Sequence, residues 1–272
     1  MDSMQVYRGM DIGTAKPTRE DRARVAHHLL DILDVTEELS VADYQRRARA
    51  TLTGLAADGV PAVIVGGSGL YVRAVLDDLR FPGSDPVIRA RWEAALDRLG
   101  APALHAELAR RDPKAAAHIL TGNGRRIVRA LEVGELTGEP FPAQLPVDGP
   151  GLVPHVSVAL AVPRPALDER IEARVHRMFD DGLETEVRRL LADGLAEGRT
   201  ASHALGYPQV IELLAGRTTA DQARADIVSA TRAYARRQER WFRRDPRTIW
   251  LPPSREIPSL VGEIVGRLRA AA

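Results

Sequence analysis

The sequence predicts an α/β fold interrupted by a helical insert, and three observations lead to this prediction. A helical pattern at 41–57 is followed by an apolar run at 60–65 and a glycine turn at 66–69, a succession typical of helices that cover a parallel sheet. A second apolar run lies at 156–162. Between the two runs, proline and glycine interrupt the chain at 82–86, and the composition that follows is helical.

We therefore expect three parts: 1–80 is the first part of the α/β core, 81–150 is the insert, and 151–272 is the second part of the core. Apolar residues at helical spacing predict the elements of the insert. These are helices at 87–99, 101–111, 113–119 and 125–136, followed by a Pro/Gly-rich exit at 139–154.

Local signals predict the elements of the core. Ser40 is placed to cap the helix at 41–57. The run at 60–65 is short and β-branched, so we expect a buried parallel strand there. The remaining core elements are a short helix and loop within 21–33, a helix at 70–76, a second buried strand at 156–162, a helix from Pro165, a long helix at 219–244, a strand at 248–251 and a closing helix at 260–271.

The composition limits the class of protein. The chain has 272 residues, of which 44% are hydrophobic and 28% charged, as in soluble globular proteins. It contains no apolar stretch long enough to span a membrane and no signal peptide, so we expect a cytoplasmic protein. Because there is no cysteine, disulfides and thiolate metal sites are excluded.

The long helix concentrates positive charge in a chain whose net charge is only +1. Seven arginines lie between Thr231 and Arg247, against Glu239 and Asp245. Arg232, Arg236 and Arg240 recur four residues apart, a spacing at which like charges repel. This pattern favours an anionic partner, although a general preference for arginine over lysine weakens the signal. Ile227, Tyr234 and Trp241 recur every seven residues and predict the buried stripe of the same helix.

The first seventeen residues are dense in groups that bind or react. They include the carboxylates of Asp2 and Asp11, the hydroxyls of Ser3 and Thr14, the amide of Gln5, the cations of Arg8 and Lys16, and the glycines Gly9 and Gly13. On composition alone, a polar surface loop would explain them.

The order of these residues resembles a known signature. Asp-Ser-x-Gln-x-Tyr-Arg-Gly-Met-Asp-Ile-Gly-Thr-Ala-Lys-Pro, at 2–17, looks like the motif of the tRNA dimethylallyltransferases, also called tRNA isopentenyltransferases. Further segments are similar to that family: Gly-Gly-Ser-Gly-Leu-Tyr at 66–71, Arg-Arg-Ile-Val-Arg-Ala-Leu-Glu-Val at 125–133, Arg-Ile-Glu-Ala-Arg at 170–174, Leu-Gly-Tyr at 205–207 and Arg-Arg-Gln-Glu-Arg-Trp-Phe-Arg at 236–243.

The resemblance implies a P-loop NTPase-like parallel sheet core with a helical insert. The family's Gly-x-x-x-x-Gly-Lys-Ser/Thr loop is not found in the sequence, since neither Lys16 nor Lys114 fits it. We therefore expect the first strand and the P-loop to be missing, as a misassigned start or a truncation would leave them.

The resemblance also implies a reaction. A dimethylallyl group passes from dimethylallyl diphosphate to N6 of the adenosine 3′-adjacent to the anticodon, in tRNAs that read codons beginning with uridine. Asp2 is the implied general base. Ser3, Met4 and Gln5 would hold the flipped-out base, and Arg174 and Mg²⁺ would neutralise the diphosphate. Arg170, Arg174 and Arg177 could equally form ordinary helix ion pairs.

The implied partner is the anticodon stem-loop of tRNA, held from two sides by a protein that we expect to be a monomer. Besides residues 2–5, the contacts implied by the resemblance are Ser68, Arg89, Arg125, Arg126, Arg129, Gly206, Tyr207, Arg236, Arg237, Gln238, Arg240, Trp241 and Arg243. Around Gly206, His203 and Pro208 replace the basic residues usual in the family, and no metal-ligand spacing is found at His203. Two other functions stay open: a P-loop small-molecule or nucleotide kinase, and a tRNA-binding remnant without activity.

Overall fold

The computed structural model describes residues 1–142, 151–152, 154–253 and 257–271. It forms two compact units, one of Met1–Asp78 with Pro150–Ala272 and the other of Leu79–Gly149. Most of the Pro/Gly-rich exit that we expected at 139–154 lies outside the described residues. No helix of the described part combines the length and the apolar character that crossing a bilayer requires.

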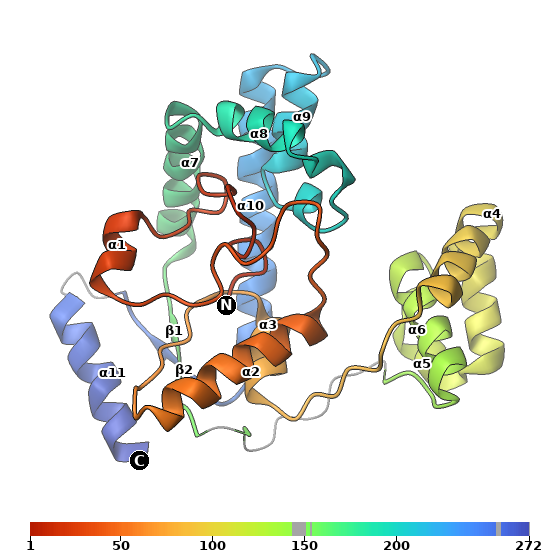
Figure 1. Cartoon of the computed structure of the whole chain (residues 1–272), viewed down its shortest axis with the longest axis horizontal. Helices are drawn as coiled ribbons and strands as arrows, with labels where there is room; N and C mark the ends of the chain where they lie inside the picture. The colour runs from red at the N-terminus through yellow and green to blue at the C-terminus, as the bar shows by residue number, and fades with distance from the viewer. Residues whose placement is uncertain (143–150, 153, 254–256, 272) are drawn as a thin grey trace. The chain divides into compact units, whose positions relative to one another are not determined.

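The larger unit is mainly helical (Figure 1). Its helices are α1 (Arg19–Arg24), α2 (Val41–Ala57), α3 (Gly69–Leu76), α7 (Arg164–Asp180), α8 (Leu183–Ala192), α9 (Tyr207–Leu214), α10 (Ala220–Phe242) and α11 (Ile257–Ala271), with short 3₁₀ turns at Leu195–Glu197 and Ala201–His203. The Ser40 hydroxyl accepts a hydrogen bond from the Asp43 N–H, as the cap of α2 requires. The prediction of this helix from its cap is confirmed.

The core of this unit lies between the N-terminal loop and helices α7 to α10. Val6, Tyr7 and Met10 of the loop are fully buried against apolar residues of these helices. From α7, Ile171, Val175 and Phe179 contribute, and their spacing is the one that predicted the helix. The stretch that carries the polar motif residues is therefore part of the core as well.

The sheet is small. Strands β1 (Ser157–Leu160) and β2 (Thr248–Leu251) run parallel, with Ser157 opposite Thr248 and Leu160 opposite Leu251. Both strands were expected, but β1 is only partly buried, and Leu160 is 49% exposed. Among the described residues the sheet has these two strands alone. The coarse prediction of an α/β fold with a parallel sheet is therefore confirmed.

The prediction of a buried strand at 60–65 is wrong for this structure. The segment is extended but forms no ladder with any described strand, and Val60, Val63 and Val65 are 48%, 86% and 73% exposed. An apolar, β-branched run becomes a strand only when a neighbour satisfies its backbone groups. No described strand lies beside this run.

The smaller unit consists of α4 (Pro86–Arg111), α5 (Pro113–His118) and α6 (Gly124–Thr137). Gly100, at φ +78°, breaks α4 between the two helices expected at 87–99 and 101–111. Trp92, Leu104 and Ile127 are among the residues of its separate core. The unit therefore has an apolar interior of its own.

Helix α10 differs from its prediction along half of its length. Ile227 is 2% exposed, whereas Tyr234, one heptad later, is 37% exposed. The stripe is thus well buried at Ile227 but not at Tyr234, and both α7 and α9 pack on this helix. The second half borders a cavity.

Candidate functional site

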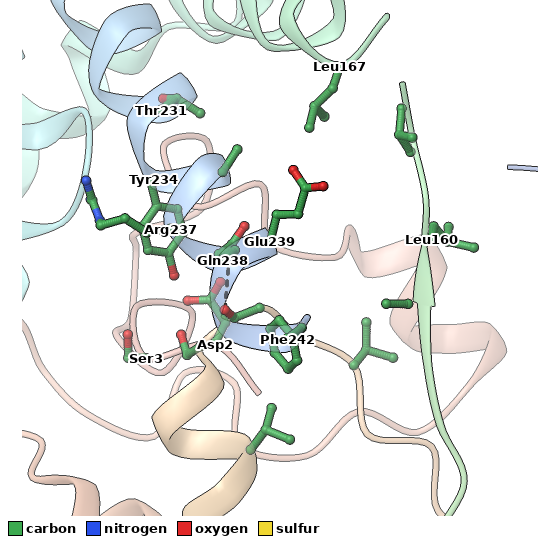
Figure 2. A pocket seen from close by; sticks show the side chains of 18 of the residues that line it. Asp2, Ser3, Leu160, Leu167, Thr231, Tyr234, Arg237, Gln238, Glu239 and Phe242 are labelled. Atoms are coloured by element: carbon green, nitrogen blue, oxygen red, sulfur yellow. Dashed lines mark hydrogen bonds between the residues drawn. The ribbon is translucent and has the colours of Figure 1, made fainter. Parts of the chain in front are cut away.

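A cavity of about 1620 Å³ opens within the larger unit. Its walls come from the N-terminal loop, the segment at 62–68, β1, α7, the loop before α9, and the second half of α10. Figure 2 shows Asp2 and Ser3 at this cavity together with Tyr234, Arg237 and Gln238 of α10. Stretches far apart in the sequence therefore meet at one opening.

Asp2 is held by its own loop. Its Oδ1 accepts hydrogen bonds from the N–H of Met4 at 2.8 Å and of Gln5 at 3.3 Å. Among the described residues, Oδ2 has no hydrogen-bond partner. One carboxylate oxygen thus fixes the side chain, and the other is available to a substrate.

The charge of Asp2 acts on several groups around the cavity. Burial lowers the pKa of the Arg174 guanidinium, and the Asp2 carboxylate opposes this by raising it. Burial also raises the pKa of Tyr71 to about 12, with the charges of Tyr7 and Asp2 adding to the effect. The pKa of Tyr44 is raised by burial and by Asp2 as well, and its ring meets that of Tyr71 edge-on, with centroids 5.0 Å apart. Asp2 and Arg174 therefore line the same cavity, and the charge of Asp2 acts on Arg174 and on both tyrosines.

The glycine turn touches α10 directly. The Gln238 Nε2 donates to the Gly67 carbonyl at 3.1 Å. A Cβ built on Gly67 would lie 2.1 Å from that same nitrogen, and one on Gly69 would lie 2.1 Å from the Trp241 ring. Two residues predicted to contact RNA, Gln238 and Trp241, thus pack on the turn that carries Ser68. Ser68 itself lines the cavity and precedes α3 without capping it through its side chain.

Several arginines in the second half of α10 and just after its end are exposed and have no ion pair among the described residues. Arg232 pairs with Glu172 at 2.8 Å, and Arg243 pairs with Glu239 at 3.0 Å while its guanidinium lies 4.3 Å from the centroid of the Trp250 ring. In the described part of the chain, Arg236, Arg237, Arg240 and Arg244 have no carboxylate partner. Arg237 also lies over the Tyr234 ring, 5.7 Å from its centroid. These four guanidinium groups are available to an anion.

Other groups of the N-terminal loop have structural partners. The Lys16 side chain is 1% exposed, and its ammonium group lies 2.8 Å from Asp11, 2.6 Å from Asp31 and 2.7 Å from the Tyr7 carbonyl. Gln5 Nε2 donates to the carbonyls of Thr14 and Ala15 at 3.0 and 3.3 Å. The loop is therefore held by hydrogen bonds and ion pairs, and it is not simply a polar loop on the surface.

Tyr207 does not fit the RNA contact that the resemblance implies. It is fully buried, and its hydroxyl donates to Glu186 Oε1 at 2.7 Å. Burial and the neighbouring Glu186 carboxylate raise its pKa. Gly206, at φ +99°, is buried too, yet its backbone borders the cavity. The side chain of Tyr207 thus belongs to the interior, whereas its neighbours His203, Leu205 and Pro208 line the cavity.

In the smaller unit, two of the arginines predicted to bind RNA hold a buried carboxylate. Glu132 is fully buried and accepts hydrogen bonds from Arg89 and Arg129, at 2.8 Å each, and from the Ser84 hydroxyl at 2.7 Å. Burial alone would raise the pKa of Glu132, but these donors outweigh it and lower the pKa to about 2. Arg125 has no partner among the described residues, and Arg126 lies over the Phe141 ring, 5.7 Å from its centroid.

Sequence reasoning missed Glu186. It lies on the apolar face of α8 with Leu183, Val187 and Leu190, and is 6% exposed. A glutamate at a core position of an amphipathic helix was the available signal. No group of three His, Cys, Asp or Glu side chains in the described ranges is arranged to hold a metal ion.

Comparison with known proteins agrees with this geometry. The family model described as IPP transferase matches residues 5–245. The chain is 63% identical to a tRNA dimethylallyltransferase of Kineococcus radiotolerans over 92% of this chain and 79% of that protein, and 59% identical to one of Thermobifida fusca over 96% and 81%.

Solved structures agree as well. The full-length tRNA isopentenylpyrophosphate transferase of Bacillus halodurans is 37% identical and superposes with a TM-score of 0.71, over 99% of this chain and 86% of that one. A eukaryotic dimethylallyltransferase acting on tRNA shares the fold, with a TM-score of 0.74 over 98% and 69% of the two chains at 19% identity. The cavity, its arginines and these matches lead to one assignment: the chain belongs to the IPP transferase family.

Proposed function

We propose that this chain is a tRNA dimethylallyltransferase. It transfers a dimethylallyl group from dimethylallyl diphosphate to N6 of the adenosine 3′-adjacent to the anticodon, in tRNAs that read codons beginning with uridine. The observation that carries the proposal is the convergence of the Asp2 carboxylate, the Arg174 guanidinium and the arginine-rich half of α10 on one cavity.

Asp2 acts as the general base. The N6 amine of adenine is a poor nucleophile, so a carboxylate that accepts its proton assists the attack on the allyl carbon. The fixed Oδ1 of Asp2, and its Oδ2, which no described residue contacts by a hydrogen bond, support this role. Ser3, Met4 and Gln5 hold the base, which must leave its stack to reach the carboxylate.

Arg174 binds the departing diphosphate. Its position at the cavity and the influence of Asp2 on its pKa support a location near the reacting groups. A guanidinium stabilises the charge that develops on the leaving oxygen.

A resident Mg²⁺ site is not supported by the side chains, because the described residues include no metal-binding cluster. We assign Mg²⁺ to the diphosphate oxygens themselves, as the ion's usual preference for substrate phosphates suggests, and derive no step from it.

The RNA-binding surface of the larger unit consists of the exposed side chains of α10 around Arg236, Arg237 and Arg240, with Arg243 alongside. Contacts of arginines to phosphates give affinity and a strong dependence on salt, but little base specificity. Gln238 and Trp241 act mainly by holding the turn that presents Ser68. Arg125 and Arg126 are the contacts that we propose for the smaller unit, and the protein acts as a cytoplasmic monomer.

The finer assignment of the core as P-loop-like is also a proposal. The apolar segment at 62–65 and the strand β1 both line the cavity, and in the described part of the chain β1 pairs with β2 alone. A further parallel strand between them would satisfy the backbone groups of both. Addition of a synthetic β-branched peptide that increases the strand content seen by infrared spectroscopy would support this proposal; unchanged spectra would contradict it.

The decisive experiment combines the chain with an anticodon stem-loop RNA, radiolabelled dimethylallyl diphosphate and Mg²⁺. We expect label on N6 of the adenosine, and a loss of about 100-fold or more in Asp2→Asn. Asp34→Asn is the matched control, because Asp34 is exposed and its partners among the described residues are Arg8 and its own turn. Binding without transfer would indicate an RNA-binding remnant, and phosphate transfer from ATP without RNA would indicate a kinase.

A further inference from the structure

A second carboxylate, Glu186, connects the N-terminal loop to the helices beneath it. It lies in α8 between the buried Leu183 and Leu190, and only 6% of it is exposed. A carboxylate in such surroundings is unfavourable unless hydrogen bonds compensate for the lost water. Its partners therefore reveal what the residue holds.

Four donors converge on this carboxylate. Oε2 accepts from the backbone N–H of Asp11 at 2.9 Å and of Ile12 at 2.7 Å. Oε1 accepts from the N–H of Gly13 at 3.1 Å and from the Tyr207 hydroxyl at 2.7 Å. Three consecutive backbone amides that face one carboxylate fix the path of the chain through them.

The neighbouring contacts leave this loop little freedom. A Cβ on Gly13 would lie 2.6 Å from the Tyr207 ring, so the backbone rests directly on the phenol. One turn along α8, Arg189 Nη2 donates to the Gly9 carbonyl at 2.8 Å. Gly9 itself has φ +75°, which favours glycine.

The held segment is linked by hydrogen bonds to Asp2. Thr14 and Ala15 follow the three amides, and their carbonyls accept from the Gln5 side chain. The backbone N–H of Gln5 in turn donates to Asp2 Oδ1 at 3.3 Å. A continuous path therefore runs from Glu186 through Gly13 and Gln5 to Asp2.

We propose that Glu186 is a positioning residue that sets the place of Gln5 and Asp2 at the cavity, and thereby the selection of adenine at the acceptor position. The inference rests on the proposed function, because it assigns base recognition to the loop at 2–5. No residue of α10 takes part in the hydrogen bonds of this path, so we expect the phosphate contacts of α10 to change little when Glu186 is altered.

The test uses Glu186→Gln, which preserves the shape of the side chain. A glutamine offers one acceptor oxygen and presents an NH₂ group to donors, so part of the donor set loses its acceptor. Glu184→Gln is the matched control, because it lies on the same helix and no described residue contacts it by a hydrogen bond or ion pair.

Two quantities are measured. Amide hydrogen exchange of 11–13 reports whether the loop is held, and we expect it to be about tenfold faster in Glu186→Gln. The second is the ratio of dissociation constants for stem-loops with adenosine or an abasic nucleotide at the acceptor position. We expect this preference to fall about fivefold, while the dependence of affinity on salt stays unchanged.

Arg189→Met provides a second variant if Glu186→Gln fails to fold, since Arg189 is exposed and contacts the loop from outside. It should show the same two changes at about threefold. Unchanged exchange and unchanged preference in either folded variant would overturn the inference. If the unaltered chain shows no preference for adenosine, base recognition by the proposed function fails, and the exchange of 11–13 still decides whether Glu186 holds the loop.

Discussion

Two of the buried carboxylates, Glu186 in the larger unit and Glu132 in the smaller unit, are stabilised in different ways. Glu186 in the larger unit receives backbone N–H groups and a phenol, whereas Glu132 in the smaller unit receives two arginines and a serine hydroxyl. The first arrangement neutralises charge with oriented dipoles and so determines the path of a loop. The second uses full positive charges and joins α6 to the start of α4.

This difference changes how the arginines of the chain are interpreted. Arg89 and Arg129 match positions that contact RNA in the family, yet here they neutralise Glu132, and Arg129 also donates to the Pro82 and Gly83 carbonyls. Arg236 and Arg240 have no such partner among the described residues. A count of arginines therefore overestimates the surface that phosphates can meet.

The largest expected effect follows from removal of Glu132, the carboxylate that Arg89 and Arg129 share. Glu132→Ala leaves two arginines without their partner and should lower the free energy of unfolding of the smaller unit by about 3 kcal/mol. Urea titration followed by hydrogen exchange of α4 and α6 measures this. Glu135→Gln, which removes a more exposed partner of Arg91, should cost less than about 1 kcal/mol. Equal costs for the two variants would contradict the distinction.

The pairing of Glu132 with the two arginines also predicts that the free energy of unfolding depends on pH. The pKa of Glu132 falls from 4.5 to about 2 on folding, so its contribution is present above pH 4.5 and is lost as pH falls toward 2. The acid loss is smaller than that of the alanine variant, because a protonated carboxyl can still accept from Ser84. Unfolding titrations between pH 5 and 2 should show a decline that Glu132→Gln removes; an unchanged slope would refute the assignment.

Loss of one hydrogen-bond donor to Glu186 should lower the free energy of unfolding by less than Glu132→Ala does. Tyr207→Phe removes a hydrogen bond to a charged group and should lower the free energy of unfolding of the larger unit by about 2 kcal/mol. Tyr234→Phe is the control, because Tyr234 is exposed and donates no hydrogen bond to the described residues. A chemical denaturation curve for each variant gives the comparison, and a cost for Tyr207→Phe no larger than that of the control would count against it.

The smallest effect on stability is expected for an arginine that has no carboxylate partner among the described residues. Arg240→Gln should leave unfolding nearly unchanged but reduce the slope of log affinity against log salt for a stem-loop RNA by about 1. Arg217→Gln, at an exposed pair with Glu212, should alter neither quantity appreciably. Arg129→Gln should lower the free energy of unfolding but leave the slope of log affinity against log salt nearly unchanged. A reduced slope in Arg129→Gln would contradict this distinction, because it would show that Arg129 also contacts phosphate.

Local signals in the sequence predicted most of the helices, because caps and breakers act within a few residues. Ser40 begins α2, and Gly100 interrupts α4. The strand predicted at 60–65 does not form, because an apolar run specifies composition but not the presence of a neighbouring strand. Strand β1 has such a neighbour in β2 and forms within the predicted range, although it is only partly buried.

The candidate site was accessible to sequence reasoning only in part. The convergence of Asp2, Arg174 and α10 on one cavity follows from motifs that the resemblance joined. Tyr207 donates to Glu186, 21 positions earlier, and Arg89 donates to Glu132, 43 positions later, so local spacing could not predict these partners. The Arg129–Glu132 pair has the i,i+3 spacing of neighbours on a helix, but the spacing does not predict that its carboxylate is buried. Which charged groups are buried is a property of tertiary packing.

The close approach of Gln238 and Trp241 to Gly67 and Gly69 has a consequence for the tolerance of this protein to change. At both glycines even a methyl group would overlap a side chain of α10, whereas at Gly54 nothing lies within 4 Å of an added carbon. A saturation library should therefore recover almost every amino acid except proline at Gly54 and almost none at Gly69, where the neighbour is the rigid Trp241 ring. At Gly67 the neighbour is the flexible end of Gln238, so small residues should survive there and large ones should require a change at 238 as well.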